Sequence, residues 1–156
     1  MGDKRRDAVA FVIDGKGYIC TGIENGEYVN DLFEYDPGTG IWTKKRAISN
    51  VSDEDYDNKY TILRAGAVSF VMDGKAYITT GRYTNYTTDT WEYDPVTDLW
   101  TQKTSFEGSS RSYAVSFTSE DGRGFVALGS LGTTSTSAFN DDLYEFKPSD
   151  TYDEDD

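Results

Sequence analysis

Two stretches of the chain share one order of residues: LFEYDPGTGIWTKK at residues 32–45 and TWEYDPVTDLWTQK at residues 90–103. In each, a tyrosine stands directly before Asp-Pro and a tryptophan follows the tyrosine by seven residues. Aromatic residues favour strands, and proline ends a strand because it cannot donate to the ladder. Each stretch therefore predicts two strands joined by a turn. A third stretch, LYEFKP at residues 143–148, repeats the beginning of the pattern without the tryptophan.

Each stretch follows two more predicted strands, which an Asp-Gly turn separates. Asp-Gly favours tight hairpins because both residues accept a positive φ. The predicted strands lie at 8–13, 17–21, 32–35 and 41–44, then at 65–72, 76–80, 90–93 and 99–103, and last at 113–117, 124–128 and 143–146. The sequence shows no long amphipathic helical period. It therefore predicts an all-β fold that repeats every 45–60 residues or so, as propeller blades do.

These residues resemble the kelch repeat over nearly the whole chain. The kelch pattern has a glycine pair after the second strand, a tyrosine before an Asp-Pro turn and then a tryptophan. Here the glycine pair is reduced to Thr-Gly or Leu-Gly, ending at Gly22, Gly81 and Gly129. The Thr-Gly form looks most like bacterial, galactose-oxidase-like kelch propellers. The resemblance implies a kelch-type β-propeller with three four-stranded blades, at about 6–46, 64–104 and 111–148, the third lacking its outer strand.

Three blades are too few to close a ring, because propellers contain roughly four to eight. We therefore expect a half-propeller of one partial domain, residues 1–156. It is either the C-terminal half of a six- or seven-bladed protein, with an N-terminal half missing, or a chain that pairs with itself as a homodimer to close a six-bladed ring. An open half exposes apolar blade faces and strand edges, which favour association.

The charge and hydrophobicity of the chain disfavour some classes of binding partner. The formal net charge is −13, which disfavours nucleic acid and anionic membranes, whose partners need clustered cations. Part of this charge lies in a long acidic inter-blade loop at 47–63 and part in an acidic tail at 149–156, and we expect the tail to be disordered. No apolar run approaches the ~20 residues of a membrane span, and the first residues do not form a signal peptide. By family analogy alone, the expected location is extracytoplasmic, in the periplasm or at the cell surface.

Loops on one side of the blades are the expected binding face, because binding residues often stand on loops that a rigid scaffold positions. Strands alternate in direction, so the second-to-third loops and the blade connections share that side. Aromatic and charged residues gather there, which suits a protein or a glycan partner. The candidate ligand-binding residues are Arg6, Arg64, Arg111, Glu24, Tyr28, Tyr56, Tyr60, Arg82, Tyr83 and Tyr86.

The three arginines, Arg6, Arg64 and Arg111, precede the first strand of each blade. The resemblance implies that such arginines line the mouth of the propeller and bind carboxylates of a partner. The alternative is that they cap backbone carbonyls or pair with an acidic residue of the protein itself. Repetition in all three copies favours this alternative, because a binding site rarely needs identical residues in every blade.

The residue types and their spacing give little indication of a catalytic or metal site. The chain contains no histidine, which excludes a histidine-ligated copper site and a Ser-His-Asp triad within it. Asp53, Asp55 and Asp57 have the spacing that begins a calcium loop but lack its later glycine and glutamate, so a solvated acidic loop is the simpler interpretation. Cys20 is the only cysteine and is expected to fill the core.

The sequence therefore predicts a non-catalytic binding module that needs no cofactor. The alternative is part of a carbohydrate-active kelch enzyme of the sialic acid mutarotase kind. For that alternative, Glu24, Arg64, Arg82 and Glu107 are available for a site of carboxylates and arginines, but no spacing singles out an acid–base pair.

Overall fold

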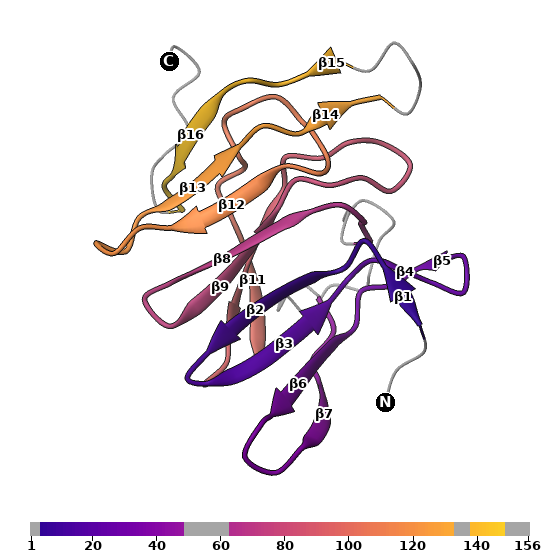
Figure 1. The fold of residues 1–156 in the computed structure, drawn as a ribbon, viewed down its shortest axis with the longest axis vertical. Coiled ribbons are helices and arrows are strands. Elements are labelled where there is room, and N and C mark those ends of the chain that lie inside the picture. Colours follow the sequence, from indigo (N-terminus) through magenta and orange to yellow (C-terminus); the bar gives the residue numbers. More distant parts are fainter. Residues whose placement is uncertain (1–3, 49–62, 133–137, 149–156) are drawn as a thin grey trace.

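The computed structural model describes residues 4–48, 63–132 and 138–148 of the chain, which form three antiparallel sheets stacked as blades (Figure 1). Blade 1 contains β2 (Val9–Ile13), β3 (Lys16–Cys20), β6 (Leu32–Asp36) and β7 (Ile41–Lys45). Blade 2 contains β8 (Val68–Met72), β9 (Lys75–Thr79), β10 (Thr90–Asp94) and β11 (Leu99–Lys103). Blade 3 contains β12 (Val115–Thr118), β13 (Gly124–Ala127) and β16 (Leu143–Phe146).

Within each blade the strands pair in chain order, as the repeated sequence predicts. The described residues contain no helix, so none that could span a membrane. The predicted all-β, kelch-type architecture is confirmed, and blade 3 has three strands within the described part of the chain. The first strands lie side by side, because β8 contacts both β2 and β12. Among the described strands, none of blade 3 contacts blade 1, so the blades form an arc that is not closed.

Short hairpins extend from the side of the blades opposite the Asp-Gly turns (Figure 1). β1 (Arg5–Arg6) pairs with β4 (Ile23–Glu24), which pairs with β5 (Glu27–Tyr28). In blade 3, β14 (Ser130–Leu131) pairs with β15 (Ala138–Phe139). In blade 2 the equivalent loop is held by isolated bridges of Arg82 to Ala65 and Tyr86. We call this side of the molecule, formed by these hairpins and the blade connections, the loop face.

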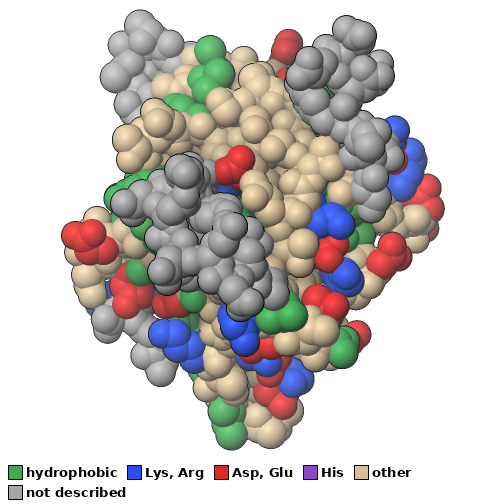
Figure 2. Space-filling view, turned by 180° about the vertical axis from the view of Figure 1, so that it is seen from behind, with side chains coloured by type: hydrophobic (Ala, Val, Ile, Leu, Met, Phe, Trp, Pro, Cys, Tyr) green, Lys and Arg blue, Asp and Glu red, His purple; other side chains and the backbone are tan. Residues whose placement is uncertain are grey.

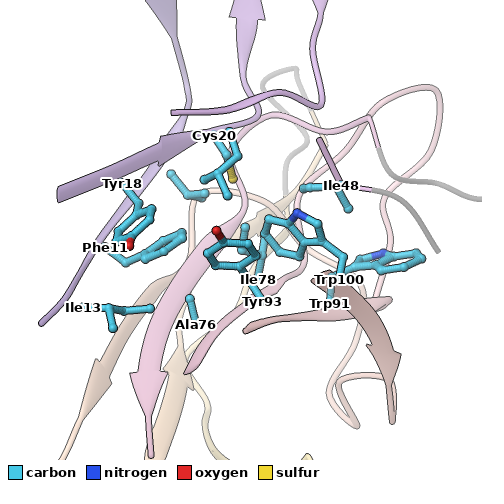
Figure 3. Close-up of a cluster of buried hydrophobic side chains, with 12 residues drawn as sticks. Phe11, Ile13, Tyr18, Cys20, Ile48, Ala76, Ile78, Trp91, Tyr93 and Trp100 are labelled. Atoms are coloured by element: carbon cyan, nitrogen blue, oxygen red, sulfur yellow. The ribbon is translucent and has the colours of Figure 1, made fainter. Parts of the chain in front are cut away.

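The hydrophobic core fills the space between neighbouring blades. Between blades 1 and 2, Phe11 and Tyr18 pack against Tyr93, and Trp91 and Trp100 are completely buried (Figure 3). The indole of Trp100 also donates a hydrogen bond of 2.9 Å to the carbonyl of Arg46, in the segment that follows blade 1. The repeated aromatic residues therefore join one blade to the next, and burial of such apolar surface is the dominant favourable term in folding.

The glycine at the end of each second strand allows this packing. Gly22 has φ +91°, and a Cβ built on it would lie 2.6 Å from the carbonyl oxygen of Arg6 and 2.9 Å from Cα of Ala8. Its amide donates to the carbonyl of Arg64 in the next blade, at 2.9 Å. Gly81 repeats this contact to Arg111 at 2.7 Å. Only glycine combines this conformation with so close an approach.

Opposite charges lie next to one another on the surface. On the face shown in Figure 2, Lys and Arg side chains are interspersed with Asp and Glu side chains. The second and third strands repeat one such pair, because Lys16 binds Glu34 at 2.9 Å in blade 1 and Lys75 binds Glu92 at 2.8 Å in blade 2. Both lysines thus neutralise carboxylates of their own sheet.

Candidate functional site

The candidate residues that the structure describes lie on the loop face, and one arginine from each blade lies beneath it, fully buried in blades 2 and 3 and 10% exposed in blade 1. The guanidinium of Arg64 donates to the carbonyls of Thr80 and Asp89, at 3.2 and 2.8 Å. The guanidinium of Arg111 donates to the carbonyl of Leu128 at 2.9 Å and makes a bidentate pair with Asp142. Neither arginine side chain is accessible to solvent. Their contacts match the alternative in which the arginines cap backbone carbonyls and pair with an acidic residue.

In blade 1 the equivalent residue is Arg5, which corrects the sequence alignment that placed Arg6 there. Arg5 donates to the carbonyl of Thr21 at 3.3 Å and binds Asp31 with two nitrogens, at 2.7 and 2.9 Å. It also binds Glu24, at 2.7 Å, and lies over the ring of Phe33. Arg6 instead points outward, with 68% of its side chain exposed, and pairs with Asp7.

Burial and ion pairing shift the pKa values of Arg64 and of Asp142, the partner of Arg111. Desolvation lowers the pKa of Arg64 to about 10, which still leaves the group charged at neutral pH. The hydrogen bond from Arg111 lowers the pKa of Asp142 below its ordinary value. Arg64 is therefore a cation beneath the loop face, held by carbonyl groups, and Arg111 is held by a carbonyl group and a carboxylate. These arginines fix where the second-to-third loops stand.

Three candidate tyrosines come together above these arginines. The rings of Tyr28 and Tyr83 meet edge to face, with centroids 4.9 Å apart, which joins the hairpin of blade 1 to the loop of blade 2. The hydroxyl of Tyr86 accepts a hydrogen bond of 2.7 Å from the amide of Gly132, which joins blade 2 to the hairpin of blade 3. Half of Tyr83 is exposed. We call Tyr28, Tyr83 and Tyr86 the tyrosine arc, because they connect the loops of all three blades.

A depression of about 780 Å³ opens beside the connection between blades 2 and 3. Its lining comprises Thr88 and Lys103 through Ser110. Glu107, a candidate acid of the enzymatic alternative, is exposed on this wall, and Phe106 is buried beneath it under the guanidinium of Arg111. The depression offers hydroxyl groups, a lysine and a carboxylate to a polar ligand.

Of the remaining candidates, some lie in the described part of the chain and others lie outside it. Glu24 is engaged by Arg5, and Arg82 is half-buried in the loop of blade 2. Tyr56, Tyr60 and the acidic residues Asp53, Asp55 and Asp57 lie outside the residues that the structure describes, and so does most of the 47–63 loop. Within the described ranges no cluster of three or more acidic, cysteine or histidine side chains forms a metal site. Cys20 is completely buried, and desolvation raises the pKa of its thiol.

Arg5 and the aspartates that precede each third strand were not among the site residues predicted from the sequence. Asp31, Asp89 and Asp142 recur at one position, directly before Leu32, Thr90 and Leu143. Alignment of the arginines on the Ala-Val pair of each first strand selects Arg5 rather than Arg6. Both signals are present in the sequence. Together they predict that an arginine contacts the aspartate before the third strand in each blade.

Comparisons with known proteins agree with this architecture. The family model described as Kelch motif matches residues 63–107, which contain all four strands of blade 2. The chain therefore contains a kelch motif in blade 2. One curated relative, named N-acetylneuraminate epimerase, from Shigella sonnei (strain Ss046), is 34% identical over 85 residues. That match covers 51% of this chain and 20% of the relative, so it spans only about a fifth of the relative's length.

Proposed function

We propose that this kelch chain is a non-catalytic binding module whose loop face binds a glycan or a protein. The tyrosine arc is the observation that carries the proposal. A tyrosine presents an apolar ring and a polar hydroxyl, a combination that suits both the faces of sugar rings and peptide side chains. The arc stands on loops whose bases are fixed by Arg5, Arg64 and Arg111, so little ordering entropy is lost on binding.

A glycan is the first ligand class to test. The depression beside Glu107 is lined mainly by small hydroxyl-bearing side chains, which can exchange hydrogen bonds with sugar hydroxyls. The relative's name refers to a sugar acid. A positively charged ligand is the other chemistry that the net charge of −13 favours, and a basic protein segment would supply it.

The test is a titration of a glycan panel and of basic peptides, followed by NMR shift changes. Tyr83→Ala should weaken binding about tenfold, equivalent to about 1.4 kcal/mol, because the exposed ring supplies much of the contact. Val96→Ala is the matched control, because Val96 is 91% exposed in the turn between β10 and β11, away from the loop face. Equal affinity in both variants would contradict a site at the tyrosine arc.

The enzymatic alternative is favoured by one observation, the relative's name. In that case Glu107 is the acid best placed to contact a ligand, since Glu24 is paired and Arg64 is buried. The chain should be incubated with N-acetylneuraminate, and interconversion of its epimers followed by NMR. A rate equal to that of buffer supports the binding module. A faster rate that Glu107→Gln abolishes would establish the enzyme instead.

A further inference from the structure

The two ends of the blade arc each expose an apolar sheet face. On blade 3 about half of Val115, Phe117 and Leu143 is open to solvent, with exposed fractions of 50%, 49% and 58%. On blade 1, Val12 is 64% exposed and Trp42 36%. Contiguous apolar surface of this kind marks an interaction site. The buried junctions between the blades show what each face is built to contact.

The two junctions within the chain repeat one aromatic arrangement. In blade 1, Phe11 and Tyr18 are stacked with centroids 5.2 Å apart, and Tyr93 of blade 2 packs on them at 6.5 and 5.9 Å. In blade 2, Phe70 and Tyr77 are stacked at 5.8 Å. Phe146 of blade 3 packs on this second pair at 5.1 and 5.9 Å. Each junction thus consists of a stacked pair and one ring from the third strand of the following blade.

Both halves of this arrangement also exist at the open ends. Blade 3 presents the stacked pair, because Phe117 and Phe125 lie 5.0 Å apart with an interplanar angle of 17°. Blade 1 presents the receiving ring, because Tyr35 rests against Trp42 at 4.9 Å, as Tyr93 rests against Trp100 at 4.9 Å. Beside Tyr35 and Trp42 lies an apolar depression of about 300 Å³ that Val12 also lines.

The backbone at the open ends is matched in the same way. The amide of Gly66 donates to the carbonyl of Asp7 at 3.0 Å, and the amide of Tyr113 donates to the carbonyl of Gly66 at 2.8 Å. These three residues occupy equivalent positions and share one left-handed conformation, with φ of 57°, 64° and 55°. A third junction would therefore pair the amide of Asp7 with the carbonyl of Tyr113.

We propose that the blade-3 face of one copy of this chain binds the blade-1 face of a second copy, and that two such junctions close a six-bladed ring. The occupant is a second copy because the chain itself carries both complementary halves, and six blades lie within the range of closed propellers. A head-to-tail contact repeats until its rotation closes, and two copies of the three described blades supply the six blades of such a ring.

One feature makes this junction weaker than those within the chain. Ser69 donates its hydroxyl to the carbonyl of Ala10 at 3.0 Å, and Ser116 donates to the carbonyl of Ser69 at 2.7 Å. The equivalent residue in blade 1 is Ala10, which has no hydroxyl to donate to a partner's Ser116. The association is accordingly reversible. This inference does not depend on the ligand of the loop face, and closure would place two tyrosine arcs around one channel.

Light scattering across a concentration series tests the proposal on the whole chain. The expected mass rises with concentration to twice the 17.5 kDa of the single chain and then stops. Val12→Lys and Phe117→Glu each place a charge at an exposed position of one end face, so the fold is retained and each variant stays monomeric. A thermal unfolding curve similar to that of the unmodified chain confirms the fold of each.

Mixing the two charged variants tests whether the blade-3 face binds the blade-1 face. A chain with Val12→Lys and a chain with Phe117→Glu form one unmodified junction and one in which lysine faces glutamate, so the mixture should regain the dimer mass. Val96→Glu, which adds the same charge away from both ends, should stay dimeric. A monomer at every concentration, masses that increase without limit, or variants that dimerise as well as the unmodified chain would each overturn the proposal.

Discussion

Phe70 and Phe117 occupy the same position in successive blades, and their surroundings differ. Each stacks on an aromatic residue of the adjacent strand, Tyr77 or Phe125. Phe70 is covered by Phe146 of the next blade and is 4% exposed, whereas Phe117 is 49% exposed. The repeat sequence therefore specifies the stacked pair, and the neighbouring blade decides whether that pair becomes core or surface.

The largest expected effect comes from truncating these two residues in turn. Phe70→Ala should lower the free energy of unfolding by about 3–5 kcal/mol, because it leaves a cavity between blades 2 and 3. Phe117→Ala should lower it by only about 1 kcal/mol at low concentration, since half of the ring is already in water. Urea denaturation of both variants measures the difference. If Phe117→Ala cost as much as Phe70→Ala at every concentration, the contrast between core and surface would be wrong.

A second comparison contrasts the glycine at a junction with a glycine at a hairpin tip. Both Gly22 and Gly26 have a positive φ, near 90°, but a Cβ on Gly26 would meet nothing within 4 Å. Gly26→Ala should therefore cost only the backbone strain, about 1–2 kcal/mol. Gly22→Ala should cost roughly 1–3 kcal/mol more, because its Cβ would clash with backbone atoms. Thermal unfolding distinguishes the two, and equal losses would show that the close approach at Gly22 is not required.

Low pH should reduce the stability that the paired carboxylates give to the packed blades. Burial opposes ionisation of Glu92, but hydrogen bonds from Lys75 and Tyr77, at 2.8 and 2.7 Å, outweigh it and lower the pKa of Glu92. Because the folded pKa lies below the unfolded value of about 4.3, this stabilisation is present above that pH and is lost as the pH falls through the folded pKa. In urea denaturation from pH 7 to pH 3, Glu92→Gln should lose less stability than the unmodified chain. A parallel loss in both would contradict the prediction.

The smallest effect is expected at an exposed aromatic residue that no blade covers. Phe139 is 81% exposed in β15. Phe139→Ser should change the free energy of unfolding by less than about 0.5 kcal/mol, as surface substitutions usually do. A larger loss in urea denaturation would mean that Phe139 is covered by a contact outside the described residues.

The strands were predictable from the sequence, because the pattern of Asp-Gly, Thr-Gly and Tyr-Asp-Pro marks where each strand must end. The observed β10 and β11 differ from the predicted ranges by at most one residue. The side of the molecule on which the candidate loops gather also followed from strand alternation. Contacts between loops of different blades, such as Tyr28 with Tyr83, did not follow, since they depend on the angle between sheets.

The arginines show most clearly which contacts could not be predicted from the sequence. Their recurrence was visible, and alignment on the Ala-Val pair of each first strand selects Arg5, but the partners of Arg5 depend on the register of β1 on β4, in which Arg5 opposes Glu24. Adjacent residues of a strand point to opposite faces, so an error of one position exchanges a buried ion pair for an exposed one.

The chain's three tryptophans allow the most direct test of the claim that its open ends are unfilled blade junctions. Trp91 and Trp100 are completely buried, whereas Trp42 is 36% exposed on the blade-1 face. Fluorine NMR of the chain labelled with 5-fluorotryptophan would follow each side chain over a concentration series, with Trp42→Phe assigning its resonance. We predict that the Trp42 resonance alone shifts as the concentration rises and that Phe117→Glu abolishes the shift. A Trp42 resonance that stays constant, or that moves equally in Phe117→Glu, would contradict the account.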